Sequence, residues 1–358
     1  MKRRSFLAAG AVAPAALAAP VVARAQTRVQ WRMPTSFPTG LATIHGGAQY
    51  MAERVSQMTD GGFTIRVFAG GEIVPPLGVL EAAQTGAVEC GFTAGFYYLG
   101  RMPALLFDTG APFGMTPRMH LAWMRQGGGK ELMAELYEEF NVVSFPAGAT
   151  GAQMGGWFRN PINSVEDLRG LRIRAAGFLG NIFADLGAVP QQIPGADLYP
   201  AMERGTLDAV EFVGPYDDER LGFNRVARYY YAPGVLELNA SIGFVANREA
   251  FNALPDSYKA ALEAACTETY SEMLARYDAL NVPALRRLVE SGTELRSWST
   301  EIMTAMRQSN DRLIEQQAEE NETFRRVYSA WKEFLDDQLL WSSVNDGAAL
   351  NFLMRAAR

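Results

Sequence analysis

The residues best suited to bind a ligand are polar side chains near the ends of short apolar segments. Arg174 ends the segment 171–174, and Gln153 and Glu211 lie in the similar segments 152–158 and 207–213. An arginine binds a carboxylate through two parallel hydrogen bonds, which a lysine cannot reproduce. The pattern favours a site for a small organic anion; the alternative is that Arg174 is an exposed strand-end arginine, like Arg172, with no ligand.

The apolar pattern around these residues predicts an α/β protein. Its first passage is a series of strand, helix, strand, helix and strand over residues 29–33, 41–58, 63–68, 79–84 and 88–93. A second passage starts near residue 141 and continues with a helix begun by Ser164, a helix over 198–204 and a strand over 207–213. Strands that alternate with helices form a largely parallel sheet, and its ligands bind at the carboxyl ends of the strands.

The order of these passages predicts two α/β lobes followed by long helices. We expect residues 26–150 to form mainly lobe 1 and residues 151–240 mainly lobe 2. Residues 241–358 are then expected to cross back and to brace the lobes with amphipathic helices over 256–281 and 300–340.

Two short segments support a repeated organisation. Residues 82–89 (AAQTGAVE) and 201–208 (AMERGTLD) both place a helix-ending glycine before an apolar and acidic step into a strand. Coincidence is a fair alternative for eight residues, because such junctions are common.

The N-terminus predicts export from the cytoplasm. Residues 1–25 carry basic residues at the start, then an Ala-rich apolar stretch and the small-residue cleavage pattern Ala23-Arg24-Ala25. Arg3-Arg4 is typical of a twin-arginine signal, and the alternative is an ordinary secretory signal. The stretch is too short and too weakly apolar for a convincing membrane span.

The mature chain is acidic. Without the four basic residues of the signal it keeps 29 basic against 39 acidic residues, a net charge of −10. Such a surface disfavours nucleic acid and anionic lipid as partners, and an anionic ligand then needs a local positive group.

Catalytic patterns are weak in this sequence. His45 and His120 are 75 residues apart without carboxylate or cysteine neighbours at ligand spacing, which gives little support to a metal site or a Ser-His-Asp triad. The adjacent acids Asp217 and Asp218 are expected in a solvated polar turn. Cys90 and Cys266 are expected to be buried thiols, with a disulfide between them as the alternative.

Four longer motifs carry a family resemblance. They are WRM followed by SFP at 31–38, GAQMGGWF at 151–158, VPQQI at 189–193 and EFVGPYDD at 211–218. On these motifs the chain resembles the extracytoplasmic solute-binding subunits of TRAP transporters, and among them those that bind α-keto acids. The resemblance implies a two-lobed periplasmic binding protein fold, type II-like, with mixed sheets, hinge crossovers and long C-terminal helices.

The resemblance also implies a bridged ligand. Arg174 matches the position that pairs with the ligand carboxylate, while Gln153, Glu211 and the backbone carbonyl of Phe212 match those that hold a cation between protein and ligand. Phe212 stands where the family commonly has tryptophan. Glu237 lies in a segment that departs from the family version. If the charge of Glu237 is not counted, a sodium ion makes the site neutral; if it is counted, a calcium ion does. We expect sodium.

Three aromatic residues complete the expected site. Tyr97 and Tyr98 are assigned to ligand contact from lobe 1, with core packing as an equal alternative. Phe178 is included because a pocket lined by it would favour a larger acid.

The expected function is a periplasmic TRAP receptor for a small 2-oxo or 2-hydroxy monocarboxylate such as pyruvate. It would deliver the acid to membrane subunits, without chemistry of its own and with a homodimer through the C-terminal helices as an option. The alternatives are a receptor for lactate or a larger carboxylate, a sensor subunit, or a twin-arginine-exported enzyme.

Overall fold

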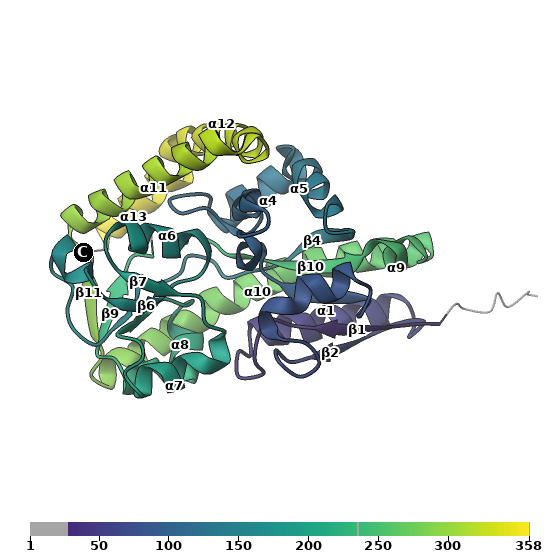
Figure 1. Ribbon diagram of the computed structural model, residues 1–358, viewed down its shortest axis with the longest axis horizontal. Coiled ribbons are helices and arrows are strands. Elements are labelled where there is room, and N and C mark those ends of the chain that lie inside the picture. Colours follow the sequence, from purple (N-terminus) through teal and green to yellow (C-terminus); the bar gives the residue numbers. More distant parts are fainter. Residues whose placement is uncertain (1–27, 235, 358) are drawn as a thin grey trace, which may run out of the picture.

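The computed structural model describes residues 28–234 and 236–357. Two lobes lie side by side; the long helix α10 (Asp256–Glu290) runs along both, and the C-terminal helices lie across the top of the view (Figure 1). The predicted export signal, residues 1–25, lies outside the described residues. Within them, no helix is both long and apolar enough to cross a membrane.

Lobe 1 contains two small sheets. In the first, β1 (Val29–Pro34) lies parallel to β2 (Phe63–Phe68). In the second, β10 (Ser241–Asn247) runs antiparallel between β3 (Cys90–Thr93) and β4 (Val142–Ala149). Its helices are α1 (Ile44–Met58), α2 (Val79–Gln84), α3 (Leu106–Thr109), α4 (Pro117–Gln126), α5 (Gly129–Glu138) and α9 (Arg248–Asn252).

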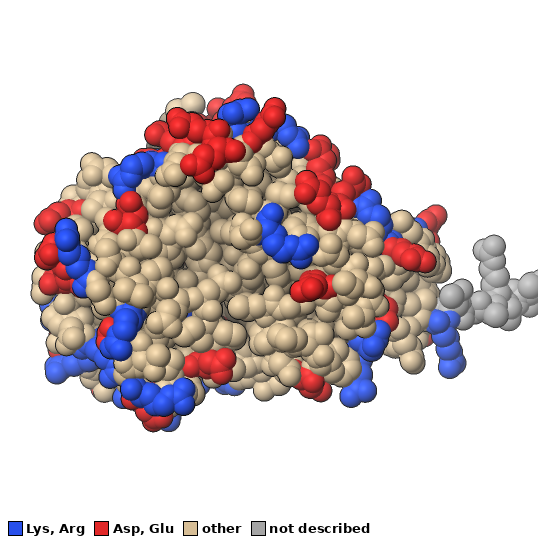
Figure 2. Space-filling view, in the orientation of Figure 1, with Lys and Arg blue, Asp and Glu red and all other residues tan. Residues whose placement is uncertain are grey.

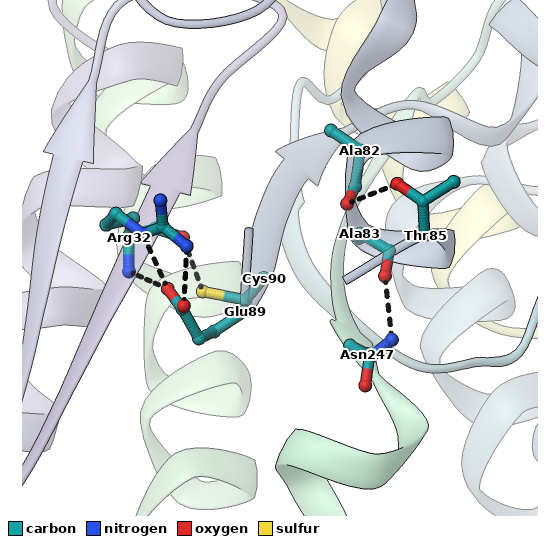
Figure 3. A network of polar contacts seen from close by, with 7 residues as sticks. All are labelled: Arg32, Ala82, Ala83, Thr85, Glu89, Cys90 and Asn247. Atoms are coloured by element: carbon teal, nitrogen blue, oxygen red, sulfur yellow. Dashed lines mark hydrogen bonds and ion pairs between the residues drawn. The ribbon is translucent and has the colours of Figure 1, made fainter. Parts of the chain in front are cut away.

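Figure 3 shows how polar contacts join these sheets. Arg32 on β1 donates to the Glu89 carboxylate from its backbone N at 2.8 Å and from its guanidinium Nη2 at 2.7 Å. The thiol of Cys90 donates to the carbonyl of Arg32, and Asn247 at the end of β10 donates to the carbonyl of Ala83 at 3.0 Å. Lobe 1 is therefore one unit despite its two sheets.

Lobe 2 is built on a six-stranded sheet in the order β11-β9-β5-β8-β6-β7. The strands are β5 (Gly156–Phe158), β6 (Arg172–Arg174), β7 (Val189–Gln191), β8 (Ala209–Val210), β9 (Tyr229–Ala232) and β11 (Glu294–Ser297). Its helices are α6 (Gly177–Asp185), α7 (Leu198–Glu203) and α8 (Pro215–Leu221). In this sheet β5 is antiparallel to its neighbours β8 and β9. In the second sheet of lobe 1, β10 is likewise antiparallel to both of its neighbours. The expected mixed sheets are therefore confirmed, whereas the largely parallel sheet that the strand and helix order favoured is wrong, because β5 and β10 run against their neighbours.

The repeated segments make the same contact in the two lobes. In lobe 2, Asp208 accepts hydrogen bonds from the backbone N of Arg172 at 3.1 Å and from its guanidinium Nε at 2.8 Å. Glu89 and Arg32 make this arrangement in lobe 1. The eight-residue match thus coincides with an equivalent strand-pairing contact in each lobe.

Two crossover segments and one helix join the lobes. The crossover 150–155 follows β4, the crossover 233–240 precedes β10, and they pair through Thr150 N to Ala240 O at 3.1 Å and Gln153 N to Glu237 O at 3.0 Å. Helix α10 is longer than the predicted 256–281 and binds lobe 1 through Glu268, which accepts from Tyr50 at 2.7 Å.

The predicted helix over 300–340 is two helices. α11 (Thr300–Glu320) ends at Asn321, whose side chain caps α12 (Glu322–Val344) by accepting from Phe324 N at 2.8 Å, and α13 (Asp346–Ala356) follows. α11 packs on α6 of lobe 2, while Trp331 of α12 packs on Phe107 of lobe 1 with ring centroids 5.1 Å apart. These helices brace both lobes.

The two cysteines are buried free thiols, so the alternative of a disulfide is wrong for this structure. His45 and His120 are buried in lobe 1, as expected of packed histidines.

Candidate functional site

A small cavity lies where the two lobes meet the crossovers. It is lined by Gln153, Arg174, Glu211, Phe212 and Glu237, with the apolar residues Phe37, Ile44, Phe96 and Tyr97 on the side of lobe 1. The space open to atom centres is about 20 Å³, and one water molecule needs about 10–15 Å³ on this measure. The surface over the junction of the lobes carries few charged residues (Figure 2). On this measure the enclosed space corresponds to one or two water molecules in this arrangement of the lobes.

Arg174 is the last residue of β6 and is only 3% exposed. Its Nη1 donates to the backbone carbonyl of Glu211 at 2.6 Å and its Nε to that of Ile193 at 3.3 Å. Nη1 also lies 3.6 Å from the Glu211 carboxylate, and the Phe212 ring centroid lies 5.0 Å from Cζ. These contacts fix the guanidinium, and since it carries five N–H donors it keeps donors for a ligand carboxylate.

Gln153 supplies a carbonyl oxygen without a protein partner. Its Nε2 donates to Thr150 Oγ1 at 3.2 Å, while its buried Oε1 makes no hydrogen bond to the described residues. Leaving a buried acceptor unpaired is unfavourable, whereas an amide oxygen is a good ligand for a hard cation. The backbone here leaves no room for a side chain at Gly234, where a Cβ would lie 2.2 Å from the Gln153 carbonyl oxygen.

Two buried carboxylates face the same cavity. Burial raises the pKa of Glu211 well above its ordinary value, and the nearby Glu237 carboxylate raises it further, while Arg174 opposes the shift. Burial also raises the pKa of Glu237 to about 8, against the opposing effect of Arg174. With both ionised, Arg174 neutralises only one of them. A cation here would favour the ionised forms of both.

The donors fit a hard cation. Among the described residues there is no cluster of three or more His, Cys, Asp or Glu side chains that could hold a metal. The cavity instead offers two carboxylates and the amide oxygen of Gln153, an all-oxygen set that suits sodium or calcium and not a metal that prefers nitrogen or sulfur.

The three aromatic residues are placed differently. Tyr97 lines the cavity, and burial raises its pKa to about 12, so its hydroxyl stays protonated. Tyr98 does not line it; its hydroxyl lies 2.8 Å from Thr93 Oγ1 and accepts from Leu80 N at 3.2 Å in the core of lobe 1. Phe178 lines a separate outer cavity beside Tyr97.

Sequence reasoning did not single out several lining residues. Thr150 orients Gln153, and Phe37, Ile44 and Phe96 form the apolar wall. Their signal was weak because apolar residues at strand and helix starts are ordinary core positions.

The comparisons with known proteins bear on this site. The chain matches the family described as bacterial extracellular solute-binding protein, family 7, over residues 37–321. The chain belongs to this family. It is 44% identical to the monocarboxylate 2-oxoacid-binding periplasmic protein of Nostoc sp., over 98% of this chain and 99% of that relative.

Solved structures of the family share the fold. A TRAP transporter solute-binding protein from Bordetella bronchiseptica, a dimer with copurified calcium and picolinate in one active site, is 46% identical with a TM-score of 0.91, covering 92% of this chain and 98% of that one. One from Pseudoalteromonas atlantica, with bound sodium and pyruvate, is 35% identical with a TM-score of 0.88, covering 90% and 99%. The predicted family and two-lobed fold are confirmed.

This family member also buries a second acidic pair close to its cavity. Asp217 and Asp218 lie on α8 and are at most 1% exposed, so the expected solvated turn is wrong. Asp218 accepts from Trp157 Nε1 at 3.0 Å and from the Tyr230 hydroxyl at 2.7 Å, and Asp217 accepts from the Tyr277 hydroxyl of α10. Burial raises the pKa of Asp217 to about 6 and that of Asp218 to about 7. The pair ties lobe 2 to α10.

The raised pKa of Asp218 predicts a pH-dependent stability. Its folded pKa lies above its unfolded value, so its contribution is complete below about pH 4 and is lost as pH rises toward 7. Over this window the free energy of unfolding of the ligand-free protein should fall, relative to Asp218→Asn, by up to about 1.4 kcal/mol per pH unit. Urea unfolding of both proteins between pH 4 and pH 8 measures the difference. A constant difference would show that Asp218 is ionised when buried.

Proposed function

We propose that this protein is a periplasmic TRAP receptor that binds a small 2-oxo or 2-hydroxy monocarboxylate such as pyruvate together with a cation. One observation carries the proposal: in a single cavity Arg174 lies beside two buried carboxylates and the unpartnered amide oxygen of Gln153. The arginine suits a carboxylate, and the oxygens suit a cation that the ligand's 2-oxo group can share. The pyruvate bound by the Pseudoalteromonas protein and the name of the Nostoc relative support this ligand class.

The proposed roles follow from these positions. Arg174 binds the ligand carboxylate, and Gln153, Glu211 and the carbonyl of Phe212 hold the cation, with Glu237 as a further ligand. Phe212 and Tyr97 contact the ligand from its apolar side. We assign Tyr98 a packing role and place Phe178 outside the immediate site.

Sodium is the proposed cation. With Glu211 ionised and Glu237 neutral, the charges of Arg174, Glu211 and a monocarboxylate sum to −1, which sodium neutralises. With Glu237 ionised the sum is −2, which calcium neutralises. The Pseudoalteromonas protein holds sodium and the Bordetella protein holds calcium, so relatives support both ions.

The setting of this function is the periplasm. The Nostoc relative is named as periplasmic, and we propose that a twin-arginine signal in residues 1–25 exports this chain. There it would hand its ligand to the membrane subunits of a TRAP transporter and act by binding alone.

We also propose a homodimer through the C-terminal helices. The end of α12 and α13 expose apolar side chains, among them Leu340, Trp341, Phe352 and Met354. Exposed apolar side chains concentrated at one end of a chain are typical of a protein interface, and the Bordetella protein is a dimer. In sedimentation experiments the mature chain should be a dimer and the Phe352→Asp variant a monomer. A wild-type monomer would contradict the proposal.

Thermal unfolding of the metal-stripped mature protein tests the proposed function. Pyruvate, 2-oxobutyrate and lactate are added alone and with sodium or calcium. A ligand at about a thousand times its dissociation constant stabilises the protein by about 4 kcal/mol, so the midpoint should rise clearly. A rise that requires both acid and cation supports the proposal. No rise with any pair would overturn the ligand class.

A further inference from the structure

A second, larger cavity lies directly behind the wall of the binding site. It has about 420 Å³ open to atom centres, against about 20 Å³ for the inner cavity. Phe96 and Tyr97 line both cavities, so these two rings are the partition between them. The outer cavity is also lined by Phe178 of α6 and by Gln317 and Phe324 of the C-terminal helices.

The two sides of the inner cavity differ in polarity. All of its charged groups, Arg174, Glu211 and Glu237, come from lobe 2 or a crossover, whereas lobe 1 supplies apolar and aromatic side chains. A carboxylate and its adjacent oxygen held by the charged groups leave the hydrocarbon end of the ligand toward lobe 1. That end meets the ring wall of Phe96 and Tyr97.

Of the two rings, that of Tyr97 is the less buried. Phe96 is buried and packs on Gly177, where even a Cβ would lie 2.9 Å from the Phe96 Cβ. Tyr97 is half-buried and borders the open volume of the outer cavity. Its backbone carbonyl accepts from Gln192 Nε2 at 3.4 Å, a contact that a change of the Tyr97 side chain leaves in place.

The outer cavity has a defined chemistry. Its walls are aromatic and apolar, with Asn181, Gln192 and Gln317 as amide side chains, and none of its lining residues carries a charge. An uncharged aliphatic or aromatic tail can be buried there, and amides can serve a neutral polar group. A second carboxylate would be desolvated without a cationic partner, which is strongly unfavourable.

We propose that the Tyr97 ring sets the length limit of the ligand, and that the outer cavity is a subsite for the uncharged tails of longer 2-oxo acids once that ring is removed. Tyr97 is thus a specificity-determining residue. The inference rests on the proposed function, because it takes the orientation of the acid from Arg174 and the cation site.

Calorimetric titration of three proteins tests the proposal in the presence of sodium or calcium, whichever supports binding. Wild type, Tyr97→Ala and Tyr97→Phe are titrated with pyruvate, 4-methyl-2-oxopentanoate and 2-oxoglutarate. Tyr97→Ala should raise the affinity for 4-methyl-2-oxopentanoate relative to pyruvate at least tenfold. Tyr97→Phe keeps the ring and should keep the wild-type ratio, and 2-oxoglutarate should gain nothing. Tyr97→Val replaces the alanine variant if the latter fails to fold.

The outcomes separate the two proposals. An unchanged ratio in Tyr97→Ala, or an equal gain for 2-oxoglutarate, overturns the length limit and leaves the proposed function standing. If none of the acids binds to any of the three proteins, the 2-oxo acid assignment of the proposed function is wrong, and the length limit falls with it.

Discussion

Arg174→Ala should lose at least a hundredfold in affinity for a 2-oxo monocarboxylate. The substitution removes the guanidinium that would bind the ligand carboxylate. It also leaves Glu211 and Glu237 buried without a neighbouring positive side chain. Truncating one partner of a buried, hydrogen-bonded charge pair costs about 2–5 kcal/mol or more. Arg174→Lys should also bind weakly, because an ammonium cannot make two parallel hydrogen bonds to a carboxylate. Calorimetric titration with pyruvate and the supporting cation measures both losses.

Arg172 provides the matched control. It lies two residues earlier on the same strand, with its side chain 45% exposed and paired with Asp208. Arg172→Ala should therefore leave affinity within about threefold of wild type, since exposed ion pairs contribute about 0–1 kcal/mol. Equal losses in the Arg172 and Arg174 variants would mean that the sheet, and not the guanidinium, is what binding requires.

The second large effect concerns cation choice. Glu237→Gln should lower calcium-supported binding at least tenfold while sodium-supported binding stays close to wild type. Glutamine imitates a protonated Glu237, so it removes a negative charge that only a divalent ion needs. Titrating each metal-stripped protein with acid in sodium or in calcium measures the two affinities.

Glu211→Gln is the contrasting variant. It removes the carboxylate nearest to Arg174 and should weaken binding with both ions. If Glu237→Gln lowers the sodium and calcium affinities equally, Glu237 does not select the ion and the charge argument fails. If it lowers sodium alone, the proposed protonation of Glu237 is wrong.

The sequence predicted which residue types form the site better than it predicted where the strands around the site begin and end. Arg174 does end a strand, as the pattern over 171–174 indicated. Gln153 instead lies on a crossover, because β5 begins only at Gly156. Apolar periodicity could not find this boundary, since a buried crossover is as apolar as a buried strand and differs only in its hydrogen-bond partners.

Other differences come from contacts between distant segments. Tyr97 and Tyr98 are adjacent and chemically alike, yet Tyr98 packs because Thr93 and Leu80 bind its hydroxyl. Asp217 and Asp218 look like a surface turn, and they are buried because Tyr277, Tyr230 and Trp157 supply donors from other elements. No local pattern contains this information.

The anchoring of α10 has a mechanical consequence. Its Glu268 is held by Tyr50 and Arg54 of lobe 1, while its Asn281 binds Tyr216 and its Arg287 binds Glu219 of lobe 2. The helix is thus attached to both lobes. Any rotation of one lobe away from the other would have to bend α10 or break its contacts at one end. No α10 residue lines the binding cavity, so a substitution in this helix could alter the coupling between the lobes without touching the ligand.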